Sequence, residues 1–156
     1  MSEHIATVEW SRGNQPFIDN RYARAHDWHF DGGATVRGSS APSALVPAPL
    51  SDPAAIDPEE ALVAALSSCH MLFFLAFAAK GGFTVDTYRD DAVGVLDRDD
   101  RGKTSITPIT LRPAVVFSGE SQPDAAAIDA LHHRAHSVCY IANSIRAEVM
   151  IEPRQA

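Results

Sequence analysis

The sequence has few cysteines and no cluster of basic charge. Two cysteines in 156 residues, Cys69 and Cys139, are too few for a disulfide scaffold. The net charge is −7, and the 13 Lys and Arg residues are scattered along the chain. Phosphate contacts need clustered cations, so this distribution opposes binding to nucleic acid or to an anionic membrane. We expect neither as a partner.

The N-terminal segment MSEHIATVEW lacks the positive charge and apolar run of a signal peptide. We therefore expect a cytoplasmic location, where paired thiols are more often redox-active or metal-binding than structural. The hydrophobic content of 46% and the charged content of 21% are ordinary for a soluble globular protein. Together with the length, they predict a single domain over residues 1–156.

One segment, from Ala61 to Ala79, contains no Asp, Glu, Lys or Arg. It approaches the ~20 residues that span a bilayer. However, the polar sequence SSCH lies at its middle and two glutamates precede it. These features favour a central core helix over a membrane helix.

Clear start and stop signals bound this helix. Asp57 suits the N-cap, Pro58 suits the first helical position, and Glu60 completes a capping box. Lys80 and the following Gly-Gly pair mark the end. Because the helix is apolar nearly all round, other elements must cover every face. A chain of this size would struggle to do so, which predicts a dimer.

The remaining patterns predict an α+β domain rather than a βαβ repeat. The expected elements are antiparallel strands within residues 4–37, a Pro- and Ser-rich loop over 38–57, the helix, strands over 83–96 and 105–117 joined by a charged turn, a second helix starting at Ser121, Pro123 and Asp124 and running to about Val138, and a strand over 145–151.

Cys69 would need a nearby cation to be reactive. Burial in apolar surroundings raises the pKa of a thiol, and Cys69 lies more than two turns from the start of the helix, beyond the reach of the helix dipole. His70 points about 100° away around the helix. The available cations are the arginines of the N-terminal strands, namely Arg12, Arg21, Arg24 and Arg37. Without one of them, Cys69 would be an inert core residue.

A second candidate site lies in LHHRAHSVC. His132, His136 and Cys139 are spaced i, i+4, i+7 and share one helical face. Imidazole and thiolate are good zinc ligands, and Cys69 or His70 could supply a fourth. Alternatively, the histidines partly face solvent near the helix end, where they interact favourably with the dipole. Both interpretations remain open.

Two motifs together resemble the OsmC/Ohr family of thiol peroxidases, which reduce organic hydroperoxides. They are DPEEALVAALSSC, followed by a long apolar helix, and AHSVCYIANS, which leads into a final strand. The resemblance covers nearly the whole chain in the order of its elements. It implies antiparallel strands wrapped around two central helices in an intertwined homodimer. It also implies the absence of a bound cofactor and a dithiol reductant of the lipoyl type.

The resemblance assigns roles to four residues. Cys69 resembles the peroxidatic thiolate that becomes a sulfenic acid, and Cys139 resembles the resolving thiol that condenses with it to a disulfide. Glu59 matches the carboxylate that pairs with an activating arginine. Arg24 in RYARAH is the first choice for that arginine, and Arg21 is the second.

Ten helical residues separate Glu59 from Cys69 by about 15 Å, so the two cannot share a compact site within one straight helix. If both belong to one site, the glutamate comes from the antiparallel helix of a partner chain. His70 and Tyr140 follow the two cysteines, where active family members usually have an aromatic residue and a proline. These differences indicate a divergent branch of the family.

The sequence thus predicts a cytoplasmic, dimeric thiol peroxidase that detoxifies organic hydroperoxides. An apolar pocket around Cys69 would favour fatty or aryl hydroperoxides over hydrogen peroxide. Two alternatives belong to other classes. One is a zinc-binding protein that uses His132, His136, Cys139 and Cys69. The other is an OsmC-like dimer that binds a ligand without peroxidase chemistry.

Overall fold

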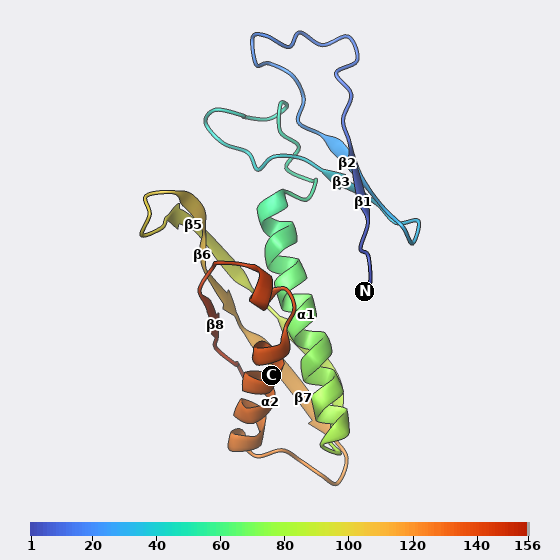
Figure 1. Cartoon of the computed structure of the whole chain (residues 1–156), viewed down its shortest axis with the longest axis vertical. Coiled ribbons are helices and arrows are strands. Elements are labelled where there is room, and N and C mark those ends of the chain that lie inside the picture. The colour runs from blue at the N-terminus through green and yellow to red at the C-terminus, as the bar shows by residue number, and fades with distance from the viewer. Residues whose placement is uncertain (156) are drawn as a thin grey trace. The chain divides into compact units, whose positions relative to one another are not determined.

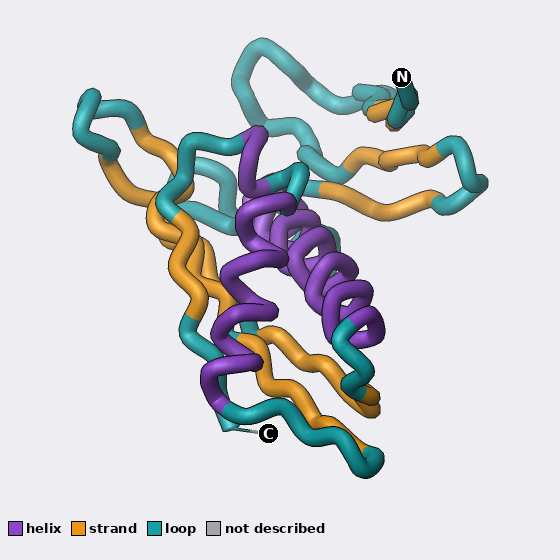
Figure 2. The backbone as a smooth tube through the Cα atoms, turned by 60° about the horizontal axis from the view of Figure 1, so that its bottom comes forward, coloured by secondary structure: helices purple, strands orange, loops and turns teal. Residues whose placement is uncertain are grey.

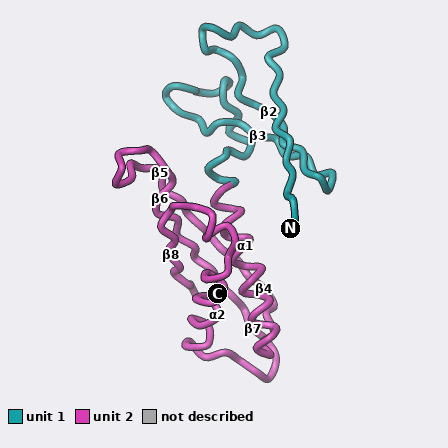
Figure 3. The backbone as a smooth tube through the Cα atoms, in the orientation of Figure 1, with its two compact units in different colours: residues 1–61 teal, residues 62–156 magenta. Residues whose placement is uncertain are grey.

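The computed structural model of the chain describes residues 1–155, which form two compact units that divide after Ala61 (Figures 1 and 3). The first unit contains a three-stranded antiparallel sheet in the order β1-β2-β3. Its strands are β1 (Ala6–Glu9), β2 (His26–Phe30) and β3 (Thr35–Gly38). Gly33, at a φ of 86°, turns the chain between β2 and β3.

Helix α1 (Pro58–Lys80) begins at the end of the first unit and continues through the second. The other elements of the second unit are β4 (Thr84–Asp90), β5 (Val93–Arg98), β6 (Thr104–Leu111), β7 (Pro113–Ser118), α2 (Ala125–Val138), a 3-10 turn η1 (Ala142–Ser144) and β8 (Val149–Ile151). In Figure 2 the two helices of this unit run side by side next to its strands. The α+β fold class is confirmed.

The capping box predicted at the start of α1 is present. The backbone N–H of Glu60 donates to Asp57 Oδ1 at 2.7 Å, and the backbone N–H of Asp57 donates to Glu60 Oε2 at 3.2 Å. This reciprocal pair satisfies two backbone donors that the helix itself cannot. Helix α2 begins one residue after Asp124, whose carboxylate accepts from the N–H of Ala127 at 2.8 Å.

The second unit has two hydrophobic clusters along α1. In the first, Leu66 packs with Ile109 and Leu111 of β6 and with Cys139. In the second, the buried members come from α1 and α2 and are surrounded by side chains of β4 and β7, among them Phe74, Ala78, Leu131, Ala135, Tyr88 and Phe117. Helix α1 therefore buries one side within its own chain, along the line Leu66, His70, Phe74 and Ala78.

The two long strands predicted over residues 83–96 and 105–117 are each interrupted, which corrects the sequence interpretation. They form β4 and β5 on one side and β6 and β7 on the other, so that β4 pairs with β7 and β5 pairs with β6. The side chain of Asp90 stabilises the interruption between these strands through two hydrogen bonds. Its carboxylate accepts from the backbone N–H of Arg112 at 2.6 Å and from the Ser67 hydroxyl at 2.5 Å. The break thus depends on a contact with α1, which no local pattern contains.

The last strand is also shorter than predicted. Residues 142–144 form the turn η1, and β8 covers Val149–Ile151 instead of 145–151. Strand β8 pairs parallel with β6, and this pair is the one exception to antiparallel pairing among the named strands of residues 1–155. Parallel neighbours need a long crossover, and here β7 and α2 lie between the two strands.

Within the described chain, α1 is the one helix long and apolar enough to cross a membrane. Length and composition of this kind are also typical of a core helix in a soluble protein. The buried line on α1 and its place in both hydrophobic clusters favour the core helix.

Replacement of Asp57 by alanine removes the N-cap acceptor of α1. We expect Asp57→Ala to lower the free energy of unfolding by about 1 kcal/mol, because the N–H of Glu60 loses its partner. Urea denaturation of the purified variant measures this loss. Asp57→Asn keeps an accepting oxygen and serves as the matched control. Equal stability of all three proteins would show that the cap contributes nothing.

Candidate functional site

The two cysteines lie together in the second unit, inside the first hydrophobic cluster. Cys69 is half-buried in the middle of α1, and Cys139 is the fully buried C-cap residue of α2. Cys69 packs against the buried cluster that contains Cys139, and both thiols are free. The structure thus brings together two residues that are 70 positions apart in the sequence (139 − 69 = 70).

The surroundings of the two thiols differ, and so do their protonation and their accessibility. Burial raises the pKa of the Cys139 thiol, and the neighbouring Cys69 thiol raises it further. The backbone N–H of Ala142 donates to Cys139 Sγ at 3.4 Å and opposes this shift only in part. Cys139 therefore keeps its proton at neutral pH. Cys69 is the thiol of the pair that a dissolved molecule can reach, because its side chain is partly exposed.

The second unit also buries a pair of histidines, His70 of α1 and His132 of α2. His70 Nε2 and His132 Nδ1 are 3.1 Å apart, and the two rings are nearly parallel, with an interplanar angle of 8°. His132 also stacks on Phe74, with ring centroids 4.3 Å apart. Burial is the largest cause that lowers the pKa of each imidazole to about 4. Both rings are therefore neutral at pH 7, and neither supplies a cation to Cys69.

The histidine pair also bears on the zinc hypothesis. His70 Nδ1, His132 Nε2 and His136 Nδ1 are buried without a hydrogen-bond partner among the described residues. His70 and His132 nevertheless use their facing nitrogens for each other. Over residues 1–155, no three His, Cys, Asp or Glu side chains are grouped so that they could hold a metal ion. The arrangement of His132, His136, Cys139 and Cys69 therefore lends no support to a zinc site.

Sequence analysis did not anticipate the contact between His70 and His132. The available signal was the spacing of His70 from Leu66 and Phe74, which places all three on one helical face with apolar neighbours. The hydroxyl of Ser67 likewise has a partner that the sequence does not indicate, because it donates to the side chain of Asp90.

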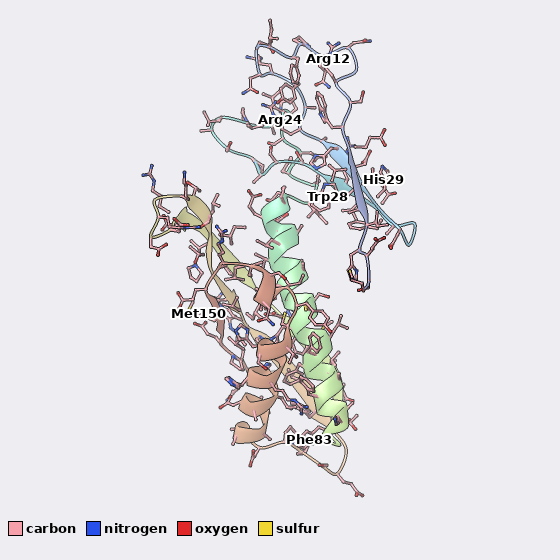
Figure 4. The ribbon with its side chains drawn as sticks, viewed as in Figure 1. Arg12, Arg24, Trp28, His29, Phe83 and Met150 are labelled. Atoms are coloured by element: carbon pink, nitrogen blue, oxygen red, sulfur yellow. The ribbon has the colours of Figure 1, made fainter. Side chains whose placement is uncertain are left out.

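The four candidate arginines all lie in the first unit and differ in their surroundings. Arg37 forms an ion pair with Asp27 at 3.0 Å, and Arg12 Nη1 donates to the carbonyl of Gln15 at 2.7 Å. Arg21 is exposed. Arg24, labelled in Figure 4, is the one half-buried member of the four. Its guanidinium contacts Asn20 and Tyr22.

Glu59 lies in the first turn of α1 and is exposed. In the part of the chain that the structure describes, its carboxylate forms no ion pair and accepts no hydrogen bond within the chain. The structure therefore brings Cys69 and Cys139 together, whereas Glu59 and Arg24 form no pair with each other within the chain.

Comparisons with known proteins place this chain in a family. A family model described as OsmC-like protein matches residues 51–154. The chain therefore belongs to the OsmC-like protein family, and the family resemblance of its two cysteine motifs is confirmed. No curated protein matches the chain at a significant level.

Solved structures agree with this assignment. The chain is 53% identical to an OsmC-like protein of unknown function from Vibrio cholerae, with a TM-score of 0.95, covering 99% of this chain and 100% of the other. Organic hydroperoxide resistance proteins share the fold at lower identity. OhrB of Bacillus subtilis is 17% identical with a TM-score of 0.68, covering 98% of each chain. A protein from Elizabethkingia anophelis is 16% identical with a TM-score of 0.73, covering 100% of this chain and 98% of the other.

The neutral histidine pair makes folding stability sensitive to acid. Because the folded state holds both imidazoles at a pKa of about 4, below the ordinary 6.5, the unfolded state binds more protons between these values. We expect the free energy of unfolding to be highest above pH 6.5 and to fall as the pH drops towards 4. Denaturant titrations across this pH range measure the slope.

His70→Gln removes one titrating group and should flatten this slope, while the control His133→Gln, at an exposed position beside His132, should leave it unchanged. A slope that is identical in all three proteins would show that the pair does not stay neutral in the folded state.

Proposed function

We propose that this protein is a two-cysteine peroxidase that reduces organic hydroperoxides. The observation that carries the proposal is the Cys69–Cys139 pair, in which an accessible thiol faces a buried, protonated one. Membership of the OsmC-like family supports it, as do the two relatives of the same fold that are named organic hydroperoxide resistance proteins.

In the proposed reaction, the Cys69 thiolate attacks the distal oxygen of the hydroperoxide. The O–O bond breaks, Cys69 becomes a sulfenic acid, and the departing alkoxide takes a proton to leave as an alcohol. Cys139 then attacks the sulfenic sulfur, which forms a disulfide and releases water. An external dithiol, for which a lipoyl-type compound is the natural candidate, reduces the disulfide and returns both thiols.

The residues around the thiols support an apolar substrate. Leu66, Ile109 and Leu111 form the buried part of the cluster, and partly buried apolar side chains such as Val63 and Ile106 pack against it. Such surroundings favour the alkyl or aryl body of an organic hydroperoxide over hydrogen peroxide. In the proposed site, Arg24 stabilises the Cys69 thiolate and Glu59 orients the arginine.

We also propose that the protein works as a homodimer in the cytoplasm. The side of α1 opposite its buried line carries an exposed stripe made of Ala64, Ala65, Ser68, Leu72, Ala76 and Ala79. This stripe is apolar except for Ser68, and the Leu72 side chain is 60% exposed. The α1 helix of a second copy is the expected cover, and an antiparallel arrangement would allow Glu59 of one chain to serve the site of the other.

Because the family match extends across the boundary between the two units, we propose that residues 1–156 act as one OsmC-like domain.

Intact mass spectrometry tests the chemistry directly. After one equivalent of cumene hydroperoxide, the reduced protein should lose about 2 Da per chain, because the two thiols become one disulfide. Cys139→Ser should show no such loss and should instead gain one oxygen at Cys69. Cys69→Ser should remain unchanged. If the wild-type thiols do not react at all, the peroxidase proposal is wrong and the ligand-binding alternative takes its place.

The dimer has its own test. Leu72→Glu places a charge on the exposed stripe of α1 and should weaken association by at least about tenfold, because an unpaired carboxylate would be buried at the interface. Light scattering coupled to size-exclusion chromatography measures the assembly over a concentration series. Leu96→Glu, at another exposed leucine (57%) on β5, is the matched control. A wild-type monomer, or a Leu72→Glu dimer of unchanged strength, would contradict the proposed interface.

A further inference from the structure

Two aromatic rings of the second unit contact each other close to the cysteines. Phe73 follows Cys69 by one turn of α1, and Tyr140 follows Cys139 directly in the sequence. The ring centroids of Phe73 and Tyr140 are 5.1 Å apart and their planes meet at 89°, an edge-to-face contact. Residues four apart in a helix share one face, so this contact lies on the side of α1 that carries Cys69. We call Phe73 and Tyr140 the aromatic pair.

Both members of the aromatic pair are held by their surroundings. Phe73 is half-buried and packs against the second hydrophobic cluster. The carbonyl of Tyr140 accepts from the hydroxyl of Ser144 at 2.7 Å. The carbonyl of Cys139, one residue earlier, accepts from the backbone N–H of Asn143 at 3.0 Å. These two hydrogen bonds fix the backbone that carries Tyr140, so the pair is formed before any ligand binds.

The Tyr140 ring is accessible, whereas two other rings along α1 are covered. Tyr140 is 72% exposed. Phe74 is fully buried and stacks on His132, and the guanidinium carbon of Arg134 lies 4.0 Å from the ring centre of Phe77. In an edge-to-face contact, the ring that presents its edge keeps both of its faces free of the other ring. Free aromatic surface is therefore present one helical turn from the accessible thiol.

We propose that the aromatic pair is an aryl-binding surface, through which the Cys69 site selects aryl hydroperoxides over alkyl hydroperoxides. This inference rests on the proposed function and names the substrate class of the same site. An aryl group on the pair gains stacked or edge-to-face contacts in addition to the burial of apolar area, whereas an alkyl group gains the burial alone. One aromatic contact of this kind corresponds to a rate factor of roughly two to ten.

Two hydroperoxides that differ in a single group test this selectivity. Cumene hydroperoxide carries a phenyl group where tert-butyl hydroperoxide carries a methyl group. Quenched-flow mass spectrometry of the reduced full-length protein measures the rate at which each compound oxidises it. Tyr140→Leu removes the ring and keeps an apolar side chain. We expect it to lower the ratio of the cumene rate to the tert-butyl rate by roughly two- to tenfold, with the tert-butyl rate unchanged.

Matched variants separate the aryl contact from folding and assembly. Tyr140→Phe keeps the ring and should keep the wild-type ratio, whereas Phe73→Leu should lower it. Phe83→Leu makes the same substitution beyond the end of α1 and should have no effect (Figure 4). Circular dichroism melting identifies any variant that fails to fold, and the exposed Tyr140 decides if Phe73→Leu does so. A changed assembly state of Tyr140→Leu in light scattering would make the pair a subunit contact and overturn the proposal.

Maleimides distinguish this inference from the proposed function, because they alkylate a thiol without any peroxide. The rates of N-phenylmaleimide and N-ethylmaleimide are compared in a Cys139→Ser background, so that Cys69 alone reacts. The phenyl to ethyl ratio should fall in Tyr140→Leu by a factor similar to that for the hydroperoxides. A fall in this ratio, together with wild-type thiols that do not react with peroxide, supports the aryl-binding surface and rejects the peroxidase. Oxidation by both hydroperoxides, with neither ratio changed in Tyr140→Leu, retains the peroxidase and overturns the surface.

Discussion

Helix α1 has to be covered on all sides, and the rest of the structure follows from this requirement. Its apolar side chains extend around the whole circumference, whereas α2 and the strands of the second unit bury only the line from Leu66 to Ala78. The same packing that covers this side also brings α2 and its C-cap against Cys69. The proposed redox centre is therefore a product of burying α1, and the opposite stripe is where a second chain would complete the core.

The parts of the fold that the sequence predicts are those that depend on neighbouring residues. Helix α1 ends at Lys80, directly before the Gly-Gly pair, and Asp57 and Asp124 cap the two helices through side-chain acceptors that lie within three residues of the donors. The interruption of the long strands is different, because Asp90 bonds to Ser67 and to Arg112. Such contacts join segments more than twenty positions apart, and no local pattern of apolar and polar residues records them.

The candidate site likewise has features that the sequence predicts and contacts that it does not. The two cysteines are visible in the sequence because their motifs are distinctive, and the structure adds that they meet. The partner of His70 could not be foreseen, since the HxxxH spacing suggested metal ligands whereas the geometry pairs His132 with His70. The contacts of Arg24 were equally hidden. They arise because the loop between β1 and β2 turns at Asn20, which brings the Asn20 and Tyr22 carbonyls to one guanidinium.

Two thiols in one apolar cluster can react one after the other only if their reactivities differ. Here the two cysteines differ in burial. Cys139 is fully enclosed, and its proton is retained because a buried thiolate would lose its hydration. A protonated thiol is a poor nucleophile, so in the proposed reaction Cys139 does not compete for peroxide and reacts only after Cys69 has become a sulfenic acid. Cys69 is partly exposed, but the surrounding cluster gives it no positive charge, since its imidazole neighbour is neutral. The proposed reaction therefore requires a cation from outside the cluster, and Arg24 is the residue that we propose for this role.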